Sequence, residues 1–174
     1  FYFKQIGLNL HDTMIYMKKN YKPPYPTVRR YAGVFEYMFI LSKGKPKTFN
    51  SLFEKKAPTS IYTRVTPFGY RKQDGTLGSK NNINTTNSLK LRTNVWKYLN
   101  THNTQDKIAF NHPAVFPEAL AEDHILSWSN NGDLVLDPMN GSGTTTKMAK
   151  QLGRNFIGID ISEDYCKIAE DRLR

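Results

Sequence analysis

The fold of this chain is decided by residues 133–145, whose sequence is DLVLDPMNGSGTT. The apolar run at its start, bounded by turn formers, predicts a buried strand that ends in the carboxylate of Asp137. Two glycines follow, which permit backbone to approach a ligand closely, and helical spacing resumes with Met148, Ala149 and Leu152 on one face. Because open α/β sheets bind ligands at the carboxyl ends of their strands, the sequence predicts a cofactor site here.

A second strand and a second acid follow at residues 156–160, FIGID, after Gly153, which suits the end of a helix. An acid at this place commonly accepts hydrogen bonds from ribose hydroxyls. The glycine loop lacks the third glycine of the dinucleotide fingerprint and the Gly-Lys-Ser/Thr of a phosphate loop. A carboxylate at Asp137 would repel a pyrophosphate but suit a cation. An adenosine ligand that carries a positively charged amino acid therefore fits better than NAD or ATP.

Three segments carry a resemblance to a known family. Residues 137–145 resemble the S-adenosylmethionine-binding motif of amino-methylating DNA methyltransferases, which modify adenine N6 or cytosine N4. Residues 112–120, HPAVFPEAL, resemble the segment before that motif in the permuted β group, and residues 158–166, GIDISEDYC, resemble the strand and helix after it. The resemblance covers about residues 108–174. It implies an α/β, permuted Rossmann-like methyltransferase fold with a mostly parallel sheet, incomplete in this chain, and with a basic recognition insert.

The resemblance also implies where S-adenosylmethionine binds. Asp137 and the glycine loop would surround its methionine end, Asp160 would take the ribose hydroxyls, and residues 112–116 would flank the pocket. His112 is expected beside the pocket rather than as a general base. The full set of expected cofactor-binding residues is His112, Pro113, Phe116, Asp137, Pro138, Gly141, Ser142, Gly143, Thr144 and Asp160.

The rest of the chain is interpreted through the same family. The β-prone runs 10–16 and 35–43 resemble its late strand pair, so residues 1–43 are expected to begin the catalytic domain, 44–107 to form the target-recognition insert, and 108–174 to complete the cofactor-binding part. Between the two runs lies the sequence YKPPY, residues 21–25. It is not assigned as the family's catalytic loop, which starts with Asp, Ser or Asn, because lysine donates hydrogen bonds and accepts none.

No catalytic residue is assigned, because the β group places its catalytic loop before everything seen here. The chain starts at Phe1 without a methionine. We therefore expect an amino-terminal part, carrying the catalytic loop and two central strands, to be missing. Without those strands, the strands near 12–17 and 35–41 cannot pair with those near 133–137 and 155–160.

Charge is divided unevenly along the chain. Residues 1–110 carry a net charge of +14 and residues 111–174 a net charge of −4, which together give +10. A phosphate-binding surface is therefore expected on the first part, and the cationic cofactor on the second. The polar run 75–88 is interpreted equally as a base-reading segment and as a mobile loop. The expected DNA-binding residues are Arg64, Arg71, Lys72, Lys80, Lys90 and Arg92.

Double-stranded DNA is the implied partner, and adenine N6 the favoured target, with cytosine N4 as the alternative. From another class, a noncatalytic DNA-binding or specificity fragment of a restriction-modification system stays open, as do a homodimer and association with the missing amino-terminal part. The single cysteine, Cys166, excludes an internal disulfide and favours a cytoplasmic protein. The four histidines show no metal-ligand spacing with it, and no apolar run reaches the length of a membrane span.

Overall fold

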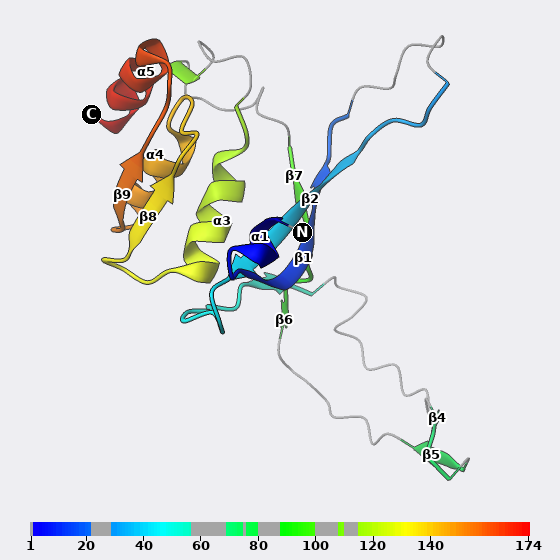
Figure 1. Ribbon diagram of the computed structural model, residues 1–174. Coiled ribbons are helices and arrows are strands. Elements are labelled where there is room, and N and C mark those ends of the chain that lie inside the picture. The colour runs from blue at the N-terminus through cyan, green and yellow to red at the C-terminus, as the bar shows by residue number, and fades with distance from the viewer. Residues whose placement is uncertain are drawn as a thin grey trace. The chain divides into compact units, whose positions relative to one another are not determined.

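The computed structural model describes residues 2–21, 29–56, 69–74, 76–79, 88–99, 108–109 and 115–174. It is an α/β structure that divides into two compact units, one of residues 1–50 with 93–174 and one of residues 51–92 (Figure 1). Within these described ranges, no helix is long and apolar enough to cross a membrane. The first unit contains α1 (Tyr2–Gln5), β1 (Asn9–Lys18), β2 (Phe35–Ser42), β7 (Val95–Tyr98), α3 (Glu118–Trp128), β8 (Leu134–Asp137), α4 (Thr144–Gln151), β9 (Asn155–Gly158) and α5 (Glu163–Leu173).

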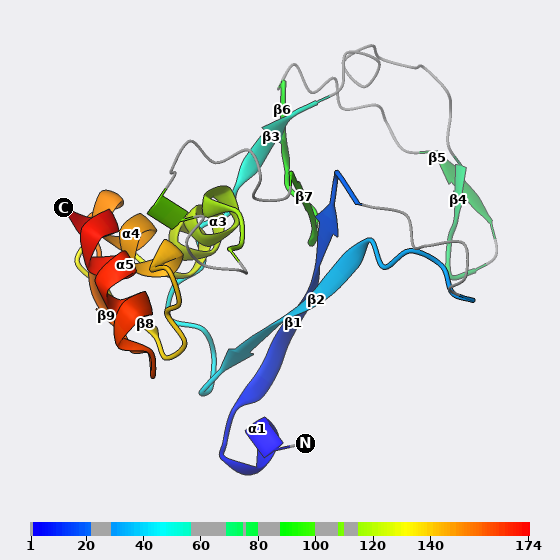
Figure 2. The same cartoon turned by 90° about the horizontal axis from the view of Figure 1, so that it is seen from above.

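Three strands of this unit form one sheet in the order β2-β1-β7 (Figure 2). β1 runs antiparallel to β2 and parallel to β7. Side chains alternate between the two faces: Met14 and Tyr16 of β1 are buried, whereas Phe35, Tyr37 and Phe39 of β2 are exposed. The strand pair predicted at 10–16 and 35–43 is confirmed, and one of its faces is bare.

The parallel pair β8 and β9 forms a separate sheet, in register from Leu134 opposite Asn155 to Asp137 opposite Gly158. Helix α4 connects the two strands and ends at Gln151, with Leu152 as its C-cap, and Gly153 follows with φ +73°. The predicted succession of strand, glycine loop, helix and strand is therefore confirmed. The predicted burial of the first strand is not met: Leu134 and Leu136 of β8 are exposed, as is Ile157 of β9, so one face of the pair is uncovered by the described residues.

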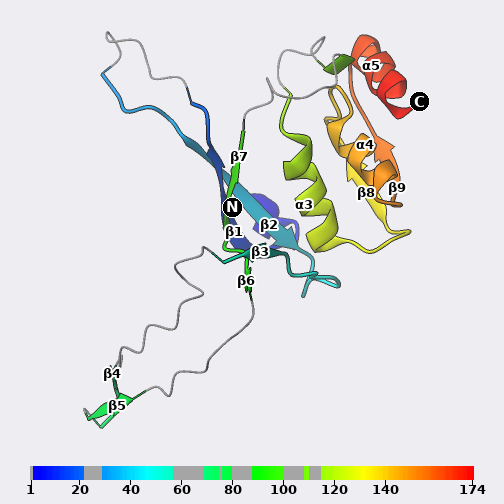
Figure 3. The same cartoon turned by 180° about the vertical axis from the view of Figure 1, so that it is seen from behind.

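Helix α3 lies between the two sheets, as Figures 1 and 3 both show. Toward the three-stranded sheet, His124 contacts the Met38 sulfur at 3.2 Å and the Trp96 ring at 4.7 Å between centroids, and Asp123 accepts a hydrogen bond from the Tyr98 hydroxyl. Toward β8 and β9 it contributes to the core cluster of Ala121, Ile125, Met148 and Ala149, against which Val135, Leu152 and Phe156 pack. The sequence interpretation did not assign this helix, although it positions both sheets.

The expectation of a mostly parallel sheet is not met by the described strands. β1–β7 and β8–β9 pair in parallel, but β1–β2, β3–β6 and β4–β5 are antiparallel, and together they make four separate sheets. β2 and β8 do not pair with each other, and each has one edge along which no described strand pairs. Among the described strands, β1 and β2 pair with neither β8 nor β9, and the expectation that central strands are missing stays a prediction.

The second unit contains β3 (Phe53–Lys55), β4 (Gly69–Arg71), β5 (Leu77–Ser79) and β6 (Leu89–Leu91). β3 pairs with β6 and β4 pairs with β5. The bounds of this unit, 51–92, differ from the 44–107 predicted for the recognition insert, and the assignment of the insert stays a prediction. Asn50, just before this unit, belongs to the first unit, where its side-chain amide donates to the carbonyls of Leu126 and Ser129 at 3.0 and 3.1 Å. After this unit, β7 completes the three-stranded sheet.

His124 predicts how the stability of the first unit depends on pH. Burial lowers the pKa of His124 below its usual 6.5, although the nearby Asp123 carboxylate opposes the shift. The unfolded chain then takes up a proton near pH 6.5 that the folded chain resists, so the free energy of unfolding falls as the pH drops below that value. Between about pH 7.5 and 5.5, the free energy of unfolding measured with urea should fall less for H124Q than for the native protein. H11Q, at an exposed histidine, is the control; equal slopes for H124Q and the native protein would contradict this account.

Candidate functional site

The carboxyl ends of β8 and β9 lie side by side and are joined by backbone hydrogen bonds. The Ile159 amide donates to the Asp137 carbonyl at 2.8 Å, and the Asn140 amide donates to the Ile159 carbonyl at 2.9 Å. The loop after β8 therefore folds back across the end of β9. This brings the two acids that end the strands, Asp137 and Asp160, to one edge of the sheet.

Asp160 is held by the glycine loop itself. Its Oδ2 accepts a hydrogen bond from the Gly141 amide at 2.8 Å, and its Oδ1 accepts one from the Ser162 amide at 2.9 Å. A carboxylate can accept about four hydrogen bonds, so these two orient the side chain without by themselves excluding ribose hydroxyls. The assignment of Asp160 to the ribose stays a prediction, and the two hydrogen bonds that orient its carboxylate are compatible with it.

Asp137 occupies the first corner of the loop. Its Oδ1 accepts a hydrogen bond from the Met139 amide at 3.0 Å, and the side chain is half-buried. Pro138 and Met139, which follow it, are exposed. The corner therefore presents a carboxylate at the sheet edge where the sequence places the cationic end of the ligand.

The two glycines of the loop both adopt left-handed backbone conformations. Gly141 has φ +51° and Gly143 has φ +78°, and Gly143 is the residue before the first turn of α4. A Cβ built on Gly143 would lie 2.7 Å from the Cβ of Ala169 in α5. Close packing of α5 therefore requires this glycine, in addition to any approach of a ligand.

The side chains of Ser142 and Thr144 face the protein. Both residues are buried, and both hydroxyls accept hydrogen bonds from Nη1 of Arg172, at 3.1 and 3.2 Å. The second guanidinium nitrogen, Nη2, donates to Glu118 Oε1 at 2.9 Å. The loop thus offers a ligand mainly its backbone. Sequence reasoning missed Arg172, because a contact across 30 residues leaves no local pattern, although Glu118 lies inside the HPAVFPEAL segment.

Phe116 lines a cavity of about 540 Å³ that runs beside α3. Met38 of β2 forms one wall, Leu134 and Val135 of β8 form another, and Thr145 at the start of α4 lies at the end nearest the glycine loop. His112 and Pro113, expected beside the cofactor, lie outside the described residues. Of His112, Pro113 and Phe116, only Phe116 is among the described residues, and its role beside the cofactor stays a prediction.

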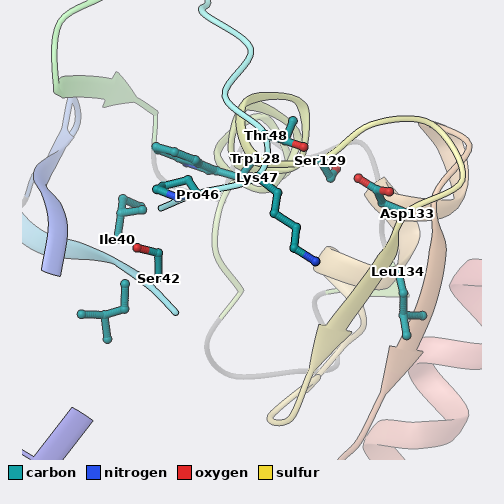
Figure 4. Close-up of a pocket in the computed structure, with 10 residues that line it drawn as sticks. Ile40, Ser42, Pro46, Lys47, Thr48, Trp128, Ser129, Asp133 and Leu134 are labelled. Carbon is teal, nitrogen blue, oxygen red and sulfur yellow. The ribbon is translucent and has the colours of Figure 1, made fainter. Parts of the chain in front are cut away.

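A second cavity, of about 450 Å³, lies at the opposite end of β8 (Figure 4). Trp128, Lys47 and Asp133 are among its lining residues, and Figure 4 shows Lys47 extending from its loop toward β8. Asp133 accepts a hydrogen bond from the Asn130 amide at 2.7 Å, which ties it to the turn after α3. Because open α/β sheets bind their ligands at the carboxyl ends of strands, the glycine loop is favoured over this cavity as the predicted cofactor site.

The predicted DNA-binding residues are distributed over the second unit. Arg64 and Lys80 lie outside the described residues, and Arg71 ends β4. Lys72 is exposed beside it. Lys90 pairs with Glu54 at 3.0 Å, which neutralises part of its charge, and Arg92 is half-buried. Lys72 is therefore the clearest candidate among them, and the DNA role of the set stays a prediction.

The chain matches the family described as DNA methylase, the N6 and N4 amino-methyltransferases, over residues 1–171. It belongs to this family. The predicted resemblance to amino-methylating DNA methyltransferases is therefore confirmed at the level of the family.

Particular relatives agree. The orphan methyltransferase M.BamHII of Bacillus amyloliquefaciens is 51% identical over 175 residues, which cover 99% of this chain and 65% of the relative. The crystal structure of the M1.HpyAVI–SAM complex is 27% identical with a TM-score of 0.64, over 99% of this chain and 66% of that one. The PvuII DNA methyltransferase, titled cytosine-N4-specific, shares the fold at 18% identity and a TM-score of 0.66, over 99% of this chain and 54% of that one. The chain thus spans about two thirds or less of these proteins.

Gly143 allows the packing of α5 on the loop to be measured. G143A combines left-handed strain, which costs about 1–2 kcal/mol for a residue with a Cβ, with a clash against Ala169. G44A is the matched control, since Gly44 has φ +77° and open space around it. Chemical denaturation should show a larger loss of unfolding free energy for G143A than for G44A. Equal losses would mean that α5 does not press on the loop.

Proposed function

We propose that the protein is an S-adenosylmethionine-dependent DNA methyltransferase that methylates the exocyclic amine of a flipped base, and that residues 137–145 with Asp160 hold the cofactor. The observation that carries the proposal is the contact of the glycine loop with Asp160, the Gly141 amide donating at 2.8 Å, at the carboxyl ends of two parallel strands. Two carboxylates at this edge favour a cationic sulfonium over an anionic nucleotide. Membership of the DNA methylase family supports the same assignment.

The chemistry divides into binding and transfer. The bound cofactor supplies an activated methyl group, and the loop and Asp160 orient it. The amine of the base is a weak nucleophile because its lone pair is delocalised, so its hydrogens need acceptors and the flipped base needs an aromatic ring to stack on. In the family, a four-residue loop beginning with Asp, Ser or Asn provides both, and this sequence contains none. The 174 residues are therefore proposed to bind the donor and the DNA, with transfer completed by a further portion.

We place that further portion between β2 and β8. Each strand has one edge that no described strand pairs with, and such edges expose backbone groups that seek partners. The cavity between them is lined mainly by apolar side chains, including Met38 and Val135. The Trp128 indole nitrogen, which also lies at this cavity, is buried with no hydrogen-bond acceptor among the described residues. Added strands would supply backbone partners for the edges and a carbonyl for the indole.

The bare faces of the two sheets support the same placement. Phe35, Tyr37 and Phe39 form a row of neighbouring rings on β2, with centroids 5.3 and 5.8 Å apart. On the other sheet, Leu134 and Leu136 are 61% and 57% exposed. A sheet covered by helices on one face needs a second layer on the other. Helices of the further portion would provide it, with a second copy of the chain as the alternative cover.

The target base is a separate proposal. The motif resemblance favours adenine N6, with cytosine N4 as the alternative. The fold does not discriminate between them, since the solved structure titled cytosine-N4-specific shares it. A noncatalytic specificity fragment is the remaining alternative, and it predicts that the glycine loop binds no cofactor.

Methyl transfer tests the proposal directly. The protein together with its further portion should move a labelled methyl group from S-adenosylmethionine to double-stranded DNA, and mass spectrometry of the digested nucleosides should find N6-methyladenine. N4-methylcytosine would shift the target to the alternative. Residues 1–174 alone should bind the cofactor without transferring methyl. Methyl transfer by residues 1–174 alone would refute the proposal that a further portion completes the reaction. If neither form bound the cofactor or transferred methyl, the proposal that the protein is a methyltransferase would be refuted.

The second unit is proposed to contact the phosphates of DNA, because residues 51–92 contain eight Lys and Arg against two acids. K72A should weaken DNA binding and lower the slope of log affinity against log salt by roughly 1, the value for one lost phosphate contact. K90A should have a smaller effect, because Glu54 already pairs with Lys90 at 3.0 Å. Fluorescence anisotropy across a salt series measures the DNA affinity of both variants. A titration with S-adenosylmethionine should show that their cofactor affinity is unchanged. A K72A slope equal to that of the native protein would remove Lys72 from the DNA surface.

A further inference from the structure

Among the charged side chains that the structure describes around the glycine loop, Arg172 of α5 is the most deeply buried. Its side chain is 1% exposed. Nη1 donates to the Ser142 carbonyl, to the Ser142 hydroxyl at 3.1 Å and to the Thr144 hydroxyl at 3.2 Å. One end of the guanidinium therefore holds the loop on both sides of Gly143.

The other end of the guanidinium reaches α3. Nη2 donates to Glu118 Oε1 at 2.9 Å, and the same oxygen accepts a hydrogen bond from Lys147 of α4 at 2.8 Å. A single carboxylate thus joins three helices at the base of the loop. Burying an arginine is costly unless it is paired and its donors are satisfied, and here Glu118 and the loop do both.

The chemistry of the contacts requires arginine rather than lysine. The guanidinium is planar and carries five donors in a fixed fork, so it can reach Ser142 with one nitrogen and Glu118 with the other. An ammonium group is a single point and cannot span both partners. The carboxyl end of α5 is also anchored, because the Lys150 amine donates to the Leu173 carbonyl.

We infer that Arg172 is a positioning residue for the cofactor: it fixes residues 141–144 in the shape that accepts the ligand and couples that shape, through Glu118, to α3. The inference rests on the proposed function, since it assumes that the loop binds S-adenosylmethionine. Two consequences follow. The Ser142 and Thr144 hydroxyls serve Arg172 rather than the ligand. The loop also depends on the last turn of the final helix, 30 residues away.

The test compares R172M and R172K with R174M in the intact protein. Arg174 is the matched control, because it follows the last residue of the same helix, is 80% exposed and forms a surface ion pair with Asp171. Hydrogen–deuterium exchange of the loop amides and calorimetry with S-adenosylmethionine are measured on each. R172M should exchange faster in residues 141–144 and bind the cofactor about tenfold more weakly, as expected for a lost charged hydrogen bond. R172K should fall between R172M and the native protein, and R174M should match the native protein.

Kinetics separate positioning from a general loss of stability. In R172K the KM for the cofactor should rise, while kcat at saturating cofactor and the KM for DNA stay within about twofold of the native values. R172K that matches the native protein in loop exchange and in cofactor affinity would overturn the inference.

The test still decides if R172M does not fold or if the native protein binds no cofactor. If R172M does not fold, E118Q replaces it, because it removes the charged partner and leaves Arg172 in place; unchanged loop exchange in E118Q and R172K overturns the inference. If the native protein binds no S-adenosylmethionine, the proposed function fails, and loop exchange alone still decides whether Arg172 fixes the loop.

Discussion

The parallel pairing of β8 with β9 is the constraint on which the candidate site depends. Residues Asp137 and Asp160 are far apart in the sequence, yet the register places the carboxyl ends of their strands side by side, with Asp137 opposite Gly158. The chain between them must then turn sharply, which explains the left-handed Gly141 and Gly143. The same turn lets the Gly141 amide donate to Asp160. Loop, acids and the first turn of α4 are consequences of one strand pairing.

Local patterns in the sequence predicted the elements that local physics determines. The apolar run before Asp137, the glycines and the apolar face with Met148 and Ala149 each leave a short-range signature, and the structure confirms the elements that they predict. Contacts across many residues leave none. Arg172 was missed for this reason, and so was the role of Glu118, which is visible only once α3, α4 and α5 come together. The mostly parallel sheet was also mispredicted, because the direction of strand pairing depends on contacts across many residues and not on a local pattern.

The two sheets of the first unit share a single support. Helix α3 packs on the three-stranded sheet through His124 and on the parallel pair through Ala121 and Ile125. It packs against one face of each sheet, but it does not pair with the open edges of β2 and β8 or cover the exposed faces of the sheets. The chain spans about 65% of the relative M.BamHII, and the glycine loop is formed although β2 and β8 each have an edge with no described partner strand. Under the proposed function, cofactor binding and methyl transfer belong to different parts of the protein.

A crystal structure of the protein with S-adenosylhomocysteine, the product of methyl transfer, tests the central claim most directly. The account predicts the ligand at the carboxyl ends of β8 and β9, against the backbone of residues 141–144, with a ribose hydroxyl about 2.6–3.0 Å from an Asp160 oxygen. The bonds from Gly141 and Ser162 to Asp160 should persist. A ligand bound in the cavity at the other end of β8, or a ribose without contact to Asp160, would contradict it.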